Sequence, residues 1–214
     1  SVQWVTNGNT GIESTNYVSS DMNVKFPQVD SPDQVYPVGP GAWVQSMPIS
    51  GTIDGVNYDH VYNTPGDAYY LQASPINDRI YIGTNVNLVL WLKEGADLSG
   101  GDLITIAQGG ALTIYTEKSF VMSGTSEINN TTQRAQNFNL LGMRTCPTIE
   151  LGGNGNITGC IYAPDSALII GGGGNNTYDF VGAGMAKTIT LSGHMNFHFD
   201  EALPAITKKG RYIP

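Results

Sequence analysis

The sequence predicts an all-β protein whose main part is a β-solenoid, a parallel β-helix-like stack of coils about 19–24 residues long. An irregular N-terminal segment rich in proline and aromatic residues precedes it. Three observations lead to this prediction: a stretch of sequence repeats without a gap, a shorter apolar and glycine unit recurs after it, and the composition favours strands and tight turns.

The composition is poor in charge and rich in glycine. Charged residues make up 13% of the chain, against about 25% in an average soluble domain, and the 214 residues include 27 glycines. Glycine permits the positive φ angles of tight turns, and asparagine tolerates them. No segment keeps apolar residues at helical spacing for three turns, so the composition and the pattern both favour short strands.

The gapless 24-residue repeat places residues 79–100 over residues 103–124. Within each copy apolar residues alternate with others, which is the period of a strand with one buried face. The matched positions are Ile80 with Ile104, Ile82 with Ile106, Leu88 with Leu112 and Leu90 with Ile114, and Ile128 continues the first series. Equivalent residues are therefore expected to stack inward on adjacent parallel strands.

A shorter unit, apolar-x-apolar followed by two small residues, recurs downstream. It begins at Ile149, Leu168 and Ile189, so its interval is shorter than that of the gapless repeat. Such a unit is typical of a short strand that ends in a sharp corner. A β-sandwich or jelly roll is the alternative, but it would place hairpin turns every 8–12 residues. The gapless repeat favours the solenoid.

Three regions follow from these patterns: a wrapping segment with edge strands at residues 1–78, the solenoid at residues 79–203, and a tail at residues 204–214. Proline is excluded from central strands, and the first region carries prolines at positions 27, 32, 37, 40, 48, 65 and 75. Its aromatic residues, which include Trp4 and Trp43, need a surface to pack on, either this solenoid or that of a neighbour.

The charge balance bears on partners and location. A net charge of −8 without a basic stripe argues against nucleic acid and against an anionic membrane surface. No run of 18 apolar residues spans a bilayer. The start at Ser1, together with the low charge, indicates a processed chain that is extracellular or on the cell surface.

An ordered series of motifs closes the repeat region. It comprises Ile161-Tyr162-Ala163-Pro164, the run Gly171–Gly174, the triplet 182–184 (Gly-Ala-Gly) and the segment 198–203 (His-Phe-Asp-Glu-Ala-Leu). The series resembles an uncharacterised bacterial surface domain with glycine-rich β-solenoid coils, often found behind a type IV pilin-like membrane segment. The resemblance covers roughly residues 79–203, implies a cell-surface or pilus-associated role, and supplies no catalytic residues. The 214 residues do not include the pilin-like segment of the common pattern, so the mode of anchoring stays open.

Segment 193–200 offers a candidate metal site. If it forms a strand, His194, Asn196, His198 and Asp200 share one face, with Met195, Phe197 and Phe199 on the other. Two histidines and a carboxylate suit zinc, but ligands along one strand converge poorly because alternate residues lie nearly 7 Å apart. The favoured interpretation is a polar cap on the end of the solenoid, with no metal or cofactor.

Two other candidate sites involve cysteine and a carboxylate–histidine pair. Cys146 and Cys160 would form a disulfide in an oxidising compartment, closing a 15-residue loop. The alternative is two buried thiols on neighbouring coils. Asp54, Asp59 and His60 could seed a carboxylate–histidine site, but turn formation through side-chain hydrogen bonds is favoured.

These observations favour a non-catalytic extracellular structural protein that builds a surface filament or pilus-like assembly and takes part in adhesion. Its partners are copies of itself joined head to tail, and surface polysaccharide is a further candidate. The expected subunit interface is the strand-like N-terminus, with Val2, Trp4 and Val5. The alternatives are a polysaccharide-binding or polysaccharide-degrading β-helix and an ice-binding protein. The sign of a hydrolase would be paired carboxylates on one strand. The sign of an ice-binding face would be a repeated Thr-x-Thr unit, and only Thr188 and Thr190 form such a unit.

Overall fold

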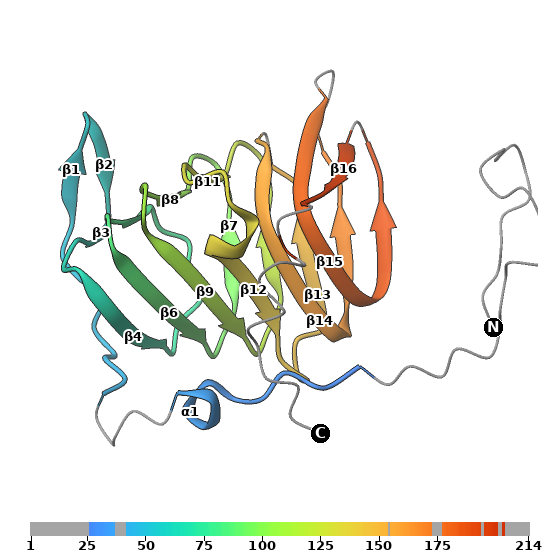
Figure 1. Ribbon diagram of the computed structural model, residues 1–214, viewed down its shortest axis with the longest axis horizontal. Helices are drawn as coiled ribbons and strands as arrows, with labels where there is room; N and C mark the ends of the chain where they lie inside the picture. The colour runs from blue at the N-terminus through green and yellow to red at the C-terminus, as the bar shows by residue number, and fades with distance from the viewer. Residues whose placement is uncertain are drawn as a thin grey trace, which may run out of the picture.

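The computed structural model describes residues 26–36, 42–153, 155–172, 177–193, 195–200 and 203, and nearly all its regular structure is strand (Figure 1). Two short helical turns, α1 (Pro32–Val35) and η2 (Ala135–Asn137), accompany the strands. The strands are β1 (Gly51–Ile53), β2 (Val56–Tyr58), β3 (His60–Tyr62), β4 (Gly66–Gln72), β5 (Ile80–Ile82), β6 (Val86–Leu92), β7 (Ala96–Leu98), β8 (Leu103–Ile106), β9 (Ala111–Thr116), β10 (Phe120–Met122), β11 (Glu127–Asn130), β12 (Phe138–Gly142), β13 (Thr148–Leu151), β14 (Ile157–Ile170), β15 (Tyr178–Leu191) and β16 (Met195–Phe199).

The strands form a parallel β-solenoid of about six turns with three walls. The first wall contains β3, β5, β8 and β11. The second contains β4, β6, β9 and β12, followed by the first halves of β14 and β15 and by β16. The third contains β7, β10 and β13, followed by the second halves of β14 and β15. The long strands β14 and β15 thus turn from the second wall into the third, with a shift in their register between Ala163 and Ala167.

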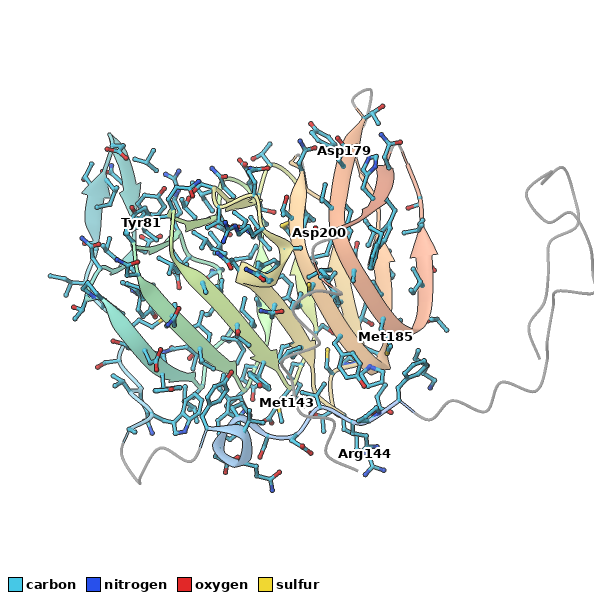
Figure 2. The ribbon with its side chains drawn as sticks, in the orientation of Figure 1. Tyr81, Met143, Arg144, Asp179, Met185 and Asp200 are labelled. Atoms are coloured by element: carbon cyan, nitrogen blue, oxygen red, sulfur yellow. The ribbon has the colours of Figure 1, made fainter. Side chains whose placement is uncertain are left out.

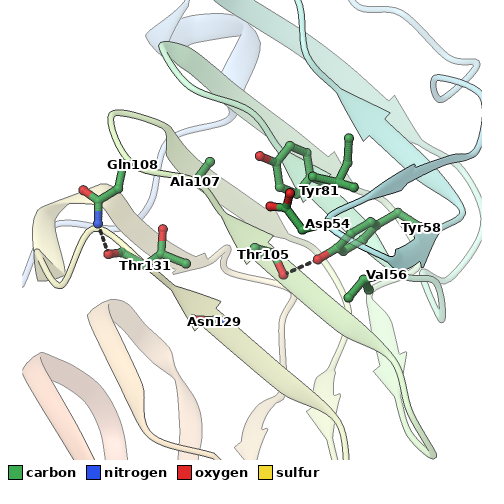
Figure 3. Close-up of a pocket in the computed structure, with 10 residues that line it drawn as sticks. Asp54, Val56, Tyr58, Tyr81, Thr105, Ala107, Gln108, Asn129 and Thr131 are labelled. Atoms are coloured by element: carbon green, nitrogen blue, oxygen red, sulfur yellow. Dashed lines mark hydrogen bonds between the residues drawn. The ribbon is translucent and has the colours of Figure 1, made fainter.

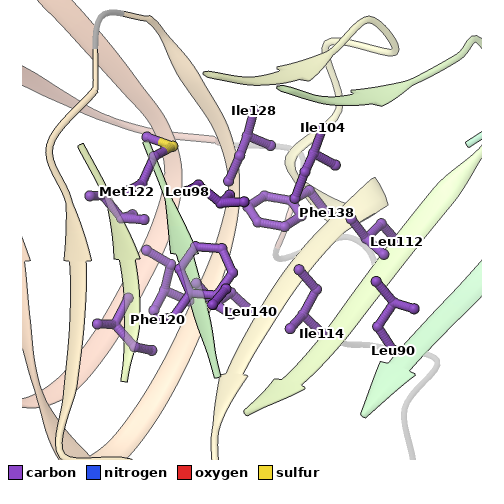
Figure 4. Packing of buried hydrophobic residues seen from close by; sticks show 14 of the residues in the cluster. Leu90, Leu98, Ile104, Leu112, Ile114, Phe120, Met122, Ile128, Phe138 and Leu140 are labelled. Carbon is purple, nitrogen blue, oxygen red and sulfur yellow. The ribbon is translucent and has the colours of Figure 1, made fainter. Parts of the chain in front are cut away.

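The register confirms the 24-residue repeat. Ile80 pairs with Ile104, Leu88 pairs with Leu112, and Ile128 follows Ile104 in the first wall. The shorter downstream unit is confirmed as well, because Ile149, Leu168 and Ile189 lie in register on the third wall. The predicted inward residues line one continuous core, part of which Figure 4 shows. Each of them is at most 1% exposed. These are Ile80, Ile82, Leu88, Leu90, Ile104, Ile106, Leu112 and Ile114.

The fourth coil is longer than its neighbours. On the third wall Phe120 pairs with Ala96 of the preceding coil and with Ile149 of the following coil. The stretch from Phe120 to Ile149 is therefore longer than the stretch from Ala96 to Phe120. The extra residues include η2. The large ring of Phe138 fills the core there, and a Cβ atom on Gly159 would come within 2.3 Å of that ring. Glycine at this position therefore compensates in volume for the neighbouring phenylalanine.

The solenoid begins one coil earlier than the repeat indicated. β3 pairs in parallel with β5, and β4 pairs in parallel with β6, so residues 60–78 belong to the stack and not to the wrapping segment. The boundary after residue 78 is corrected to the start of β3. His60 pairs with Ile80, and Ile80 pairs with Ile104, so the first coil is shorter than the second. It therefore does not align with the second coil at the offset of the repeat.

Residues 26–36 and 42–50 form a segment, here called the strap. Residues 26–36 run past the arrowhead ends of the second-wall strands, and residues 42–50 lie at the β4 end of the stack (Figure 1). Tyr36 packs against Tyr69 and Tyr115, with ring centroids 5.4 and 6.2 Å apart. Trp43 packs against Tyr69 and Trp91 at 5.5 and 5.6 Å. Tyr36 and Trp43 therefore pack on this chain's own solenoid, which is the first of the two surfaces that the sequence left open.

Candidate functional site

The last coil of the described solenoid leaves its apolar residues uncovered. On the third wall Ile149 and Leu168 are 0% and 1% exposed, whereas Ile189, the next residue in that column, is 50% exposed. Leu191 is 56% exposed, although its neighbour Ile170 is fully buried. The change has a geometric cause, because each coil of a solenoid is buried by the coil that follows it.

β16 covers part of this end on the second wall. The Phe197 ring stacks on the buried Phe180 ring, with centroids 4.7 Å apart and planes 13° apart. Phe197 nevertheless stays 43% exposed, so part of this ring remains open to solvent. Figure 1 shows β15 and β16 at the end of the stack opposite the β1–β2 hairpin.

Polar contacts hold β16 on β15. Asn196 Nδ2 donates to Asp179 Oδ1 at 2.9 Å, and His198 Nε2 donates to the same oxygen at 3.1 Å. These bonds, that of Asn196 first, lower the pKa of Asp179 below its ordinary value. Asn196 and His198 therefore share one face, as the alternation predicted. Figure 2 labels Asp179 and Asp200 in this region.

Asp200, the described carboxylate of the candidate metal site, bonds to the backbone of another element. The backbone N–H of Ala135, in η2, donates to Asp200 Oδ2 at 3.4 Å, and His194 lies outside the described residues. Among the residues that are described, no group of three histidine, cysteine or acidic side chains is arranged to hold a metal ion.

The predicted disulfide between Cys146 and Cys160 is wrong, because both cysteines are free thiols. Cys146 packs inside the core, and Ser166 donates to its backbone oxygen. Cys160 lies between the buried Gly159 and Ile161, so its side chain is directed to the outside of the second wall. The two thiols thus lie on opposite sides of a sheet wall. Burial raises the pKa of both.

Asp59 and His60 do not form a pair. The Asp59 carboxylate accepts the backbone N–H of Arg79 at 2.9 Å. His60 shares a hydrogen bond with the carbonyl of Pro48 through Nδ1 at 2.7 Å, and its Nε2 lies 3.5 Å from Asp78. These contacts fix the start of the first coil, and they join residues far apart in the sequence instead of forming the local side-chain hydrogen bonds expected of a turn.

The Thr-x-Thr unit of β15 is not part of a rank of threonines. Thr188 and Thr190 have Ala167 and Ile169 as their neighbours on β14. An ice-binding face would need threonine on successive coils, and the preceding coil does not supply it.

A cleft of about 350 Å³ lies between the β1–β2 hairpin and the outside of the first wall (Figure 3). The hairpin turns at Asp54 and Gly55, which have φ angles of 50° and 80°, as expected for a two-residue Asp-Gly turn. Tyr58, at the end of β2, shares a 3.0 Å hydrogen bond with Thr105 on β8. This bond fixes the hairpin against the wall.

Three successive coils form the floor of this cleft. Tyr81 pairs with Thr105, and Thr105 pairs with Asn129, so β5, β8 and β11 each contribute one outward side chain at the same level. Thr131 and Gln108 continue the lining. Burial, the carboxylate of Asp54 and the nearby Tyr58 raise the pKa of Tyr81, so its hydroxyl stays protonated and able to donate.

A second cleft of about 280 Å³ lies on the outside of the second wall beside the strap. Three of its polar side chains already bond within the protein: Asn87 Nδ2 donates to Asp67 at 2.9 Å, and Asn139 Nδ2 donates to the Gln136 backbone carbonyl at 2.9 Å. Tyr36 and Tyr69 form its aromatic side.

Sequence reasoning did not identify the lining of the first cleft. Tyr81, Thr105 and Asn129 follow one another at the interval of the 24-residue repeat, so the pattern that located the core also placed these three outward side chains in one column. The contribution of the hairpin had no comparable signal. Val2, Trp4 and Val5, the expected interface, lie outside the described residues.

No helix of the described chain is long and apolar enough to cross a membrane. A family model described as "Domain of unknown function (DUF7305)" matches residues 44–206. No curated protein and no solved structure gives a significant match.

Proposed function

We propose that this chain, which belongs to the DUF7305 family, is a non-catalytic structural protein of the cell surface whose copies join through the uncovered last coil. The observation that carries the proposal is the exposure of Ile189, Leu191 and Phe197, next to columns whose earlier members are buried. An apolar end of this kind is stabilised when another segment covers it.

The backbone of the last coil can also accept a partner. Residues 188–191 of β15 pair with β14 on one side, and in the described part of the chain no strand pairs with them on the other. An unpaired strand edge offers N–H and C=O groups to an added strand. An incoming segment would therefore gain main-chain hydrogen bonds together with apolar burial.

The proposed occupant is the N-terminal segment of a neighbouring copy, with Val2, Trp4 and Val5 as its apolar residues. The strap is bonded near this end, because Tyr162 on β14 donates its hydroxyl proton to the Pro27 carbonyl. The chain that precedes Phe26 can extend to about 80–90 Å. The solenoid itself is only about 29 Å long, for six coils at about 4.8 Å each, so the segment is long enough to reach a copy stacked behind it.

Donation in one direction along a row of copies does not close on itself, so it builds a filament. The place proposed for that filament is the outside of the cell, with a pilus-like or adhesive role. The resemblance of the last coils to a surface domain supports this place. A pilin-like segment ahead of the domain, as that resemblance implies, would anchor it.

The test is the mass of the protein in solution and its appearance by electron microscopy. The unmodified chain is expected to form concentration-dependent filaments. Deleting residues 1–10, or replacing Ile189 by Asp, is expected to leave folded monomers. Val35→Asp is the matched control, because Val35 is 46% exposed on α1, away from the last coil, and this variant should assemble normally.

Each other outcome counts against the proposal. A chain that remains a monomer at high concentration would show that the last coil does not bind a second copy. A discrete dimer would indicate that two copies exchange their N-terminal segments reciprocally and do not build a filament. Filaments that persist in Ile189→Asp would place the contact elsewhere.

A further inference from the structure

The cleft beside the β1–β2 hairpin combines an aromatic surface with polar groups that are not bonded within the described structure. Tyr58 and Tyr81 lie with their ring centroids 5.3 Å apart, inclined at 53°. Tyr58 is buried, and Tyr81 is half-buried, so the Tyr81 ring is the accessible one (Figure 3). A half-exposed tyrosine presents an apolar ring and a polar tip to the same ligand.

The polar groups of the lining differ in whether they already form hydrogen bonds within the protein. Thr105 bonds to Tyr58, Gln108 donates to the Thr131 carbonyl, and Thr131 Oγ1 donates to the Ile106 carbonyl. The Asp54 carboxylate and the Asn129 side-chain amide make no hydrogen bond to any residue that the structure describes. They lie on opposite sides of the cleft, one on the hairpin and one on the floor. A ligand with several hydroxyl groups could satisfy both.

The cleft has the size of a small-molecule site. Its volume of about 350 Å³ falls within the usual range of about 300–1,000 Å³ for ligand pockets. A single pyranose fits within it, and a longer chain would extend over the floor. Tyr81, Thr105 and Asn129 follow one another at the coil spacing of about 4.8 Å, which is close to the length of one sugar residue in a linear chain.

The charge of the cleft selects against anionic ligands. Among the described residues that line it, Asp54 is the only charged one, and the whole chain carries a net charge of −8. An acidic polysaccharide would meet repulsion without a cation to offset it. Arg79 does not change this, because its guanidinium lies over the Tyr58 ring at 6.0 Å and the residue is outside the lining.

We propose that this cleft binds a neutral, linear oligosaccharide, with one sugar packed on Tyr81 and its hydroxyl groups bonded to Asp54 and Asn129. Sugars suit this arrangement because a pyranose has apolar C–H faces and a rim of hydroxyl groups. The cleft on the second wall is less suited, since its Asn87, Asp67 and Asn139 already bond within the protein. The proposal does not depend on self-assembly through the last coil.

The test is a binding screen of the full chain against immobilised linear oligosaccharides of glucose, mannose, galactose and N-acetylglucosamine, with oligogalacturonate as the anionic probe. The strongest neutral probe is then titrated by calorimetry. Tyr81→Ala and Asn129→Ala are each expected to weaken binding at least about tenfold. Tyr81→Phe keeps the ring and should retain most of the affinity.

Asn139→Ala is the matched control, because Asn139 belongs to the same coil as Asn129 but faces the other cleft. It should bind as the unmodified chain does. Circular dichroism and the melting temperature verify that every variant is folded. The proposal is overturned if no neutral probe binds at millimolar concentration, if oligogalacturonate binds more tightly than the neutral probes, or if Asn139→Ala loses affinity while Tyr81→Ala and Asn129→Ala keep it.

Discussion

The two cysteines show how the direction of one side chain decides its chemistry. Cys146 lies in the core and its Sγ donates weakly to the Thr148 carbonyl at 3.6 Å. Cys160 follows Gly159 on β14 and so takes the outward position of the alternating strand. A sheet wall separates the thiols, and a disulfide cannot cross it without movement of the backbone.

We therefore expect two free thiols in the purified, unreduced protein. After denaturation, an alkylating reagent should add two groups, counted by intact mass. The thiols of the native protein should be labelled more slowly than those of the denatured protein at every pH from about 7 to 9. The reason is that burial raises the pKa of both thiols and leaves less of the reactive thiolate. Cys160→Ser identifies which thiol reacts first. An unreduced chain that takes up no label after denaturation would restore the disulfide.

At the scale of the element, the strap stabilises the second wall in two ways. Its aromatic rings cover Tyr69 and Trp91, and its backbone continues the sheet beyond β4. Val44 donates its N–H to the Tyr69 carbonyl at 3.0 Å and accepts the N–H of Leu71 at 2.9 Å. The strap thus protects an edge that would otherwise stay open at the first coil.

Replacing Trp43 by Ala should lower the stability of this end. The half-buried indole packs on two rings, so its loss should cost about 2 kcal/mol and lower the melting temperature by about 4–8 °C. Trp43→Phe should be nearly neutral, because it keeps a ring and removes the Nε1 group, which is buried without a hydrogen-bond partner in the described structure. Calorimetry of the unmodified chain, Trp43→Ala and Trp43→Phe measures the three melting temperatures. Equal melting temperatures for the Ala and Phe variants would show that the rings contribute little.

For the whole molecule, the stack makes stability depend on where a coil lies. A middle coil is covered on both sides, whereas the last described coil is covered on one. Ile106 is fully buried and Ile189 is 50% exposed, although both are isoleucines at inward positions of the repeat pattern. The same substitution should therefore have different effects at the two positions.

Ile106→Asp should unfold the middle coils, with a loss of more than about 4 kcal/mol, because it buries a carboxylate without a partner. Ile189→Asp should change the free energy of unfolding by less than about 1 kcal/mol, because the carboxylate remains in water. Urea unfolding followed by circular dichroism measures both. Similar losses in the two variants would mean that the last coil is covered as completely as the middle ones.

The sequence by itself determined the parallel stack, its register through the middle coils and the inward columns. It could do so because residues of one type recur at a fixed interval, and stacking at that interval buries all of them together. The same interval would have located the column of Tyr81, Thr105 and Asn129 on the outer face. Local alternation also predicted that Asn196 and His198 share a face, which their common bond to Asp179 confirms.

Only the tertiary structure decided the features that depend on contacts without a repeat. The first coil is shorter than the second, so the 24-residue offset did not reveal it. The hairpin and the strap pack on the walls through contacts that do not recur from coil to coil, such as that between Tyr58 and Thr105, and no periodic pattern encodes these. The side of the wall that each cysteine occupies depends on the path of the chain around the fourth coil. Periodic burial can be predicted from sequence, because many residues report it at once, whereas a single long-range contact is specified by the two residues that make it.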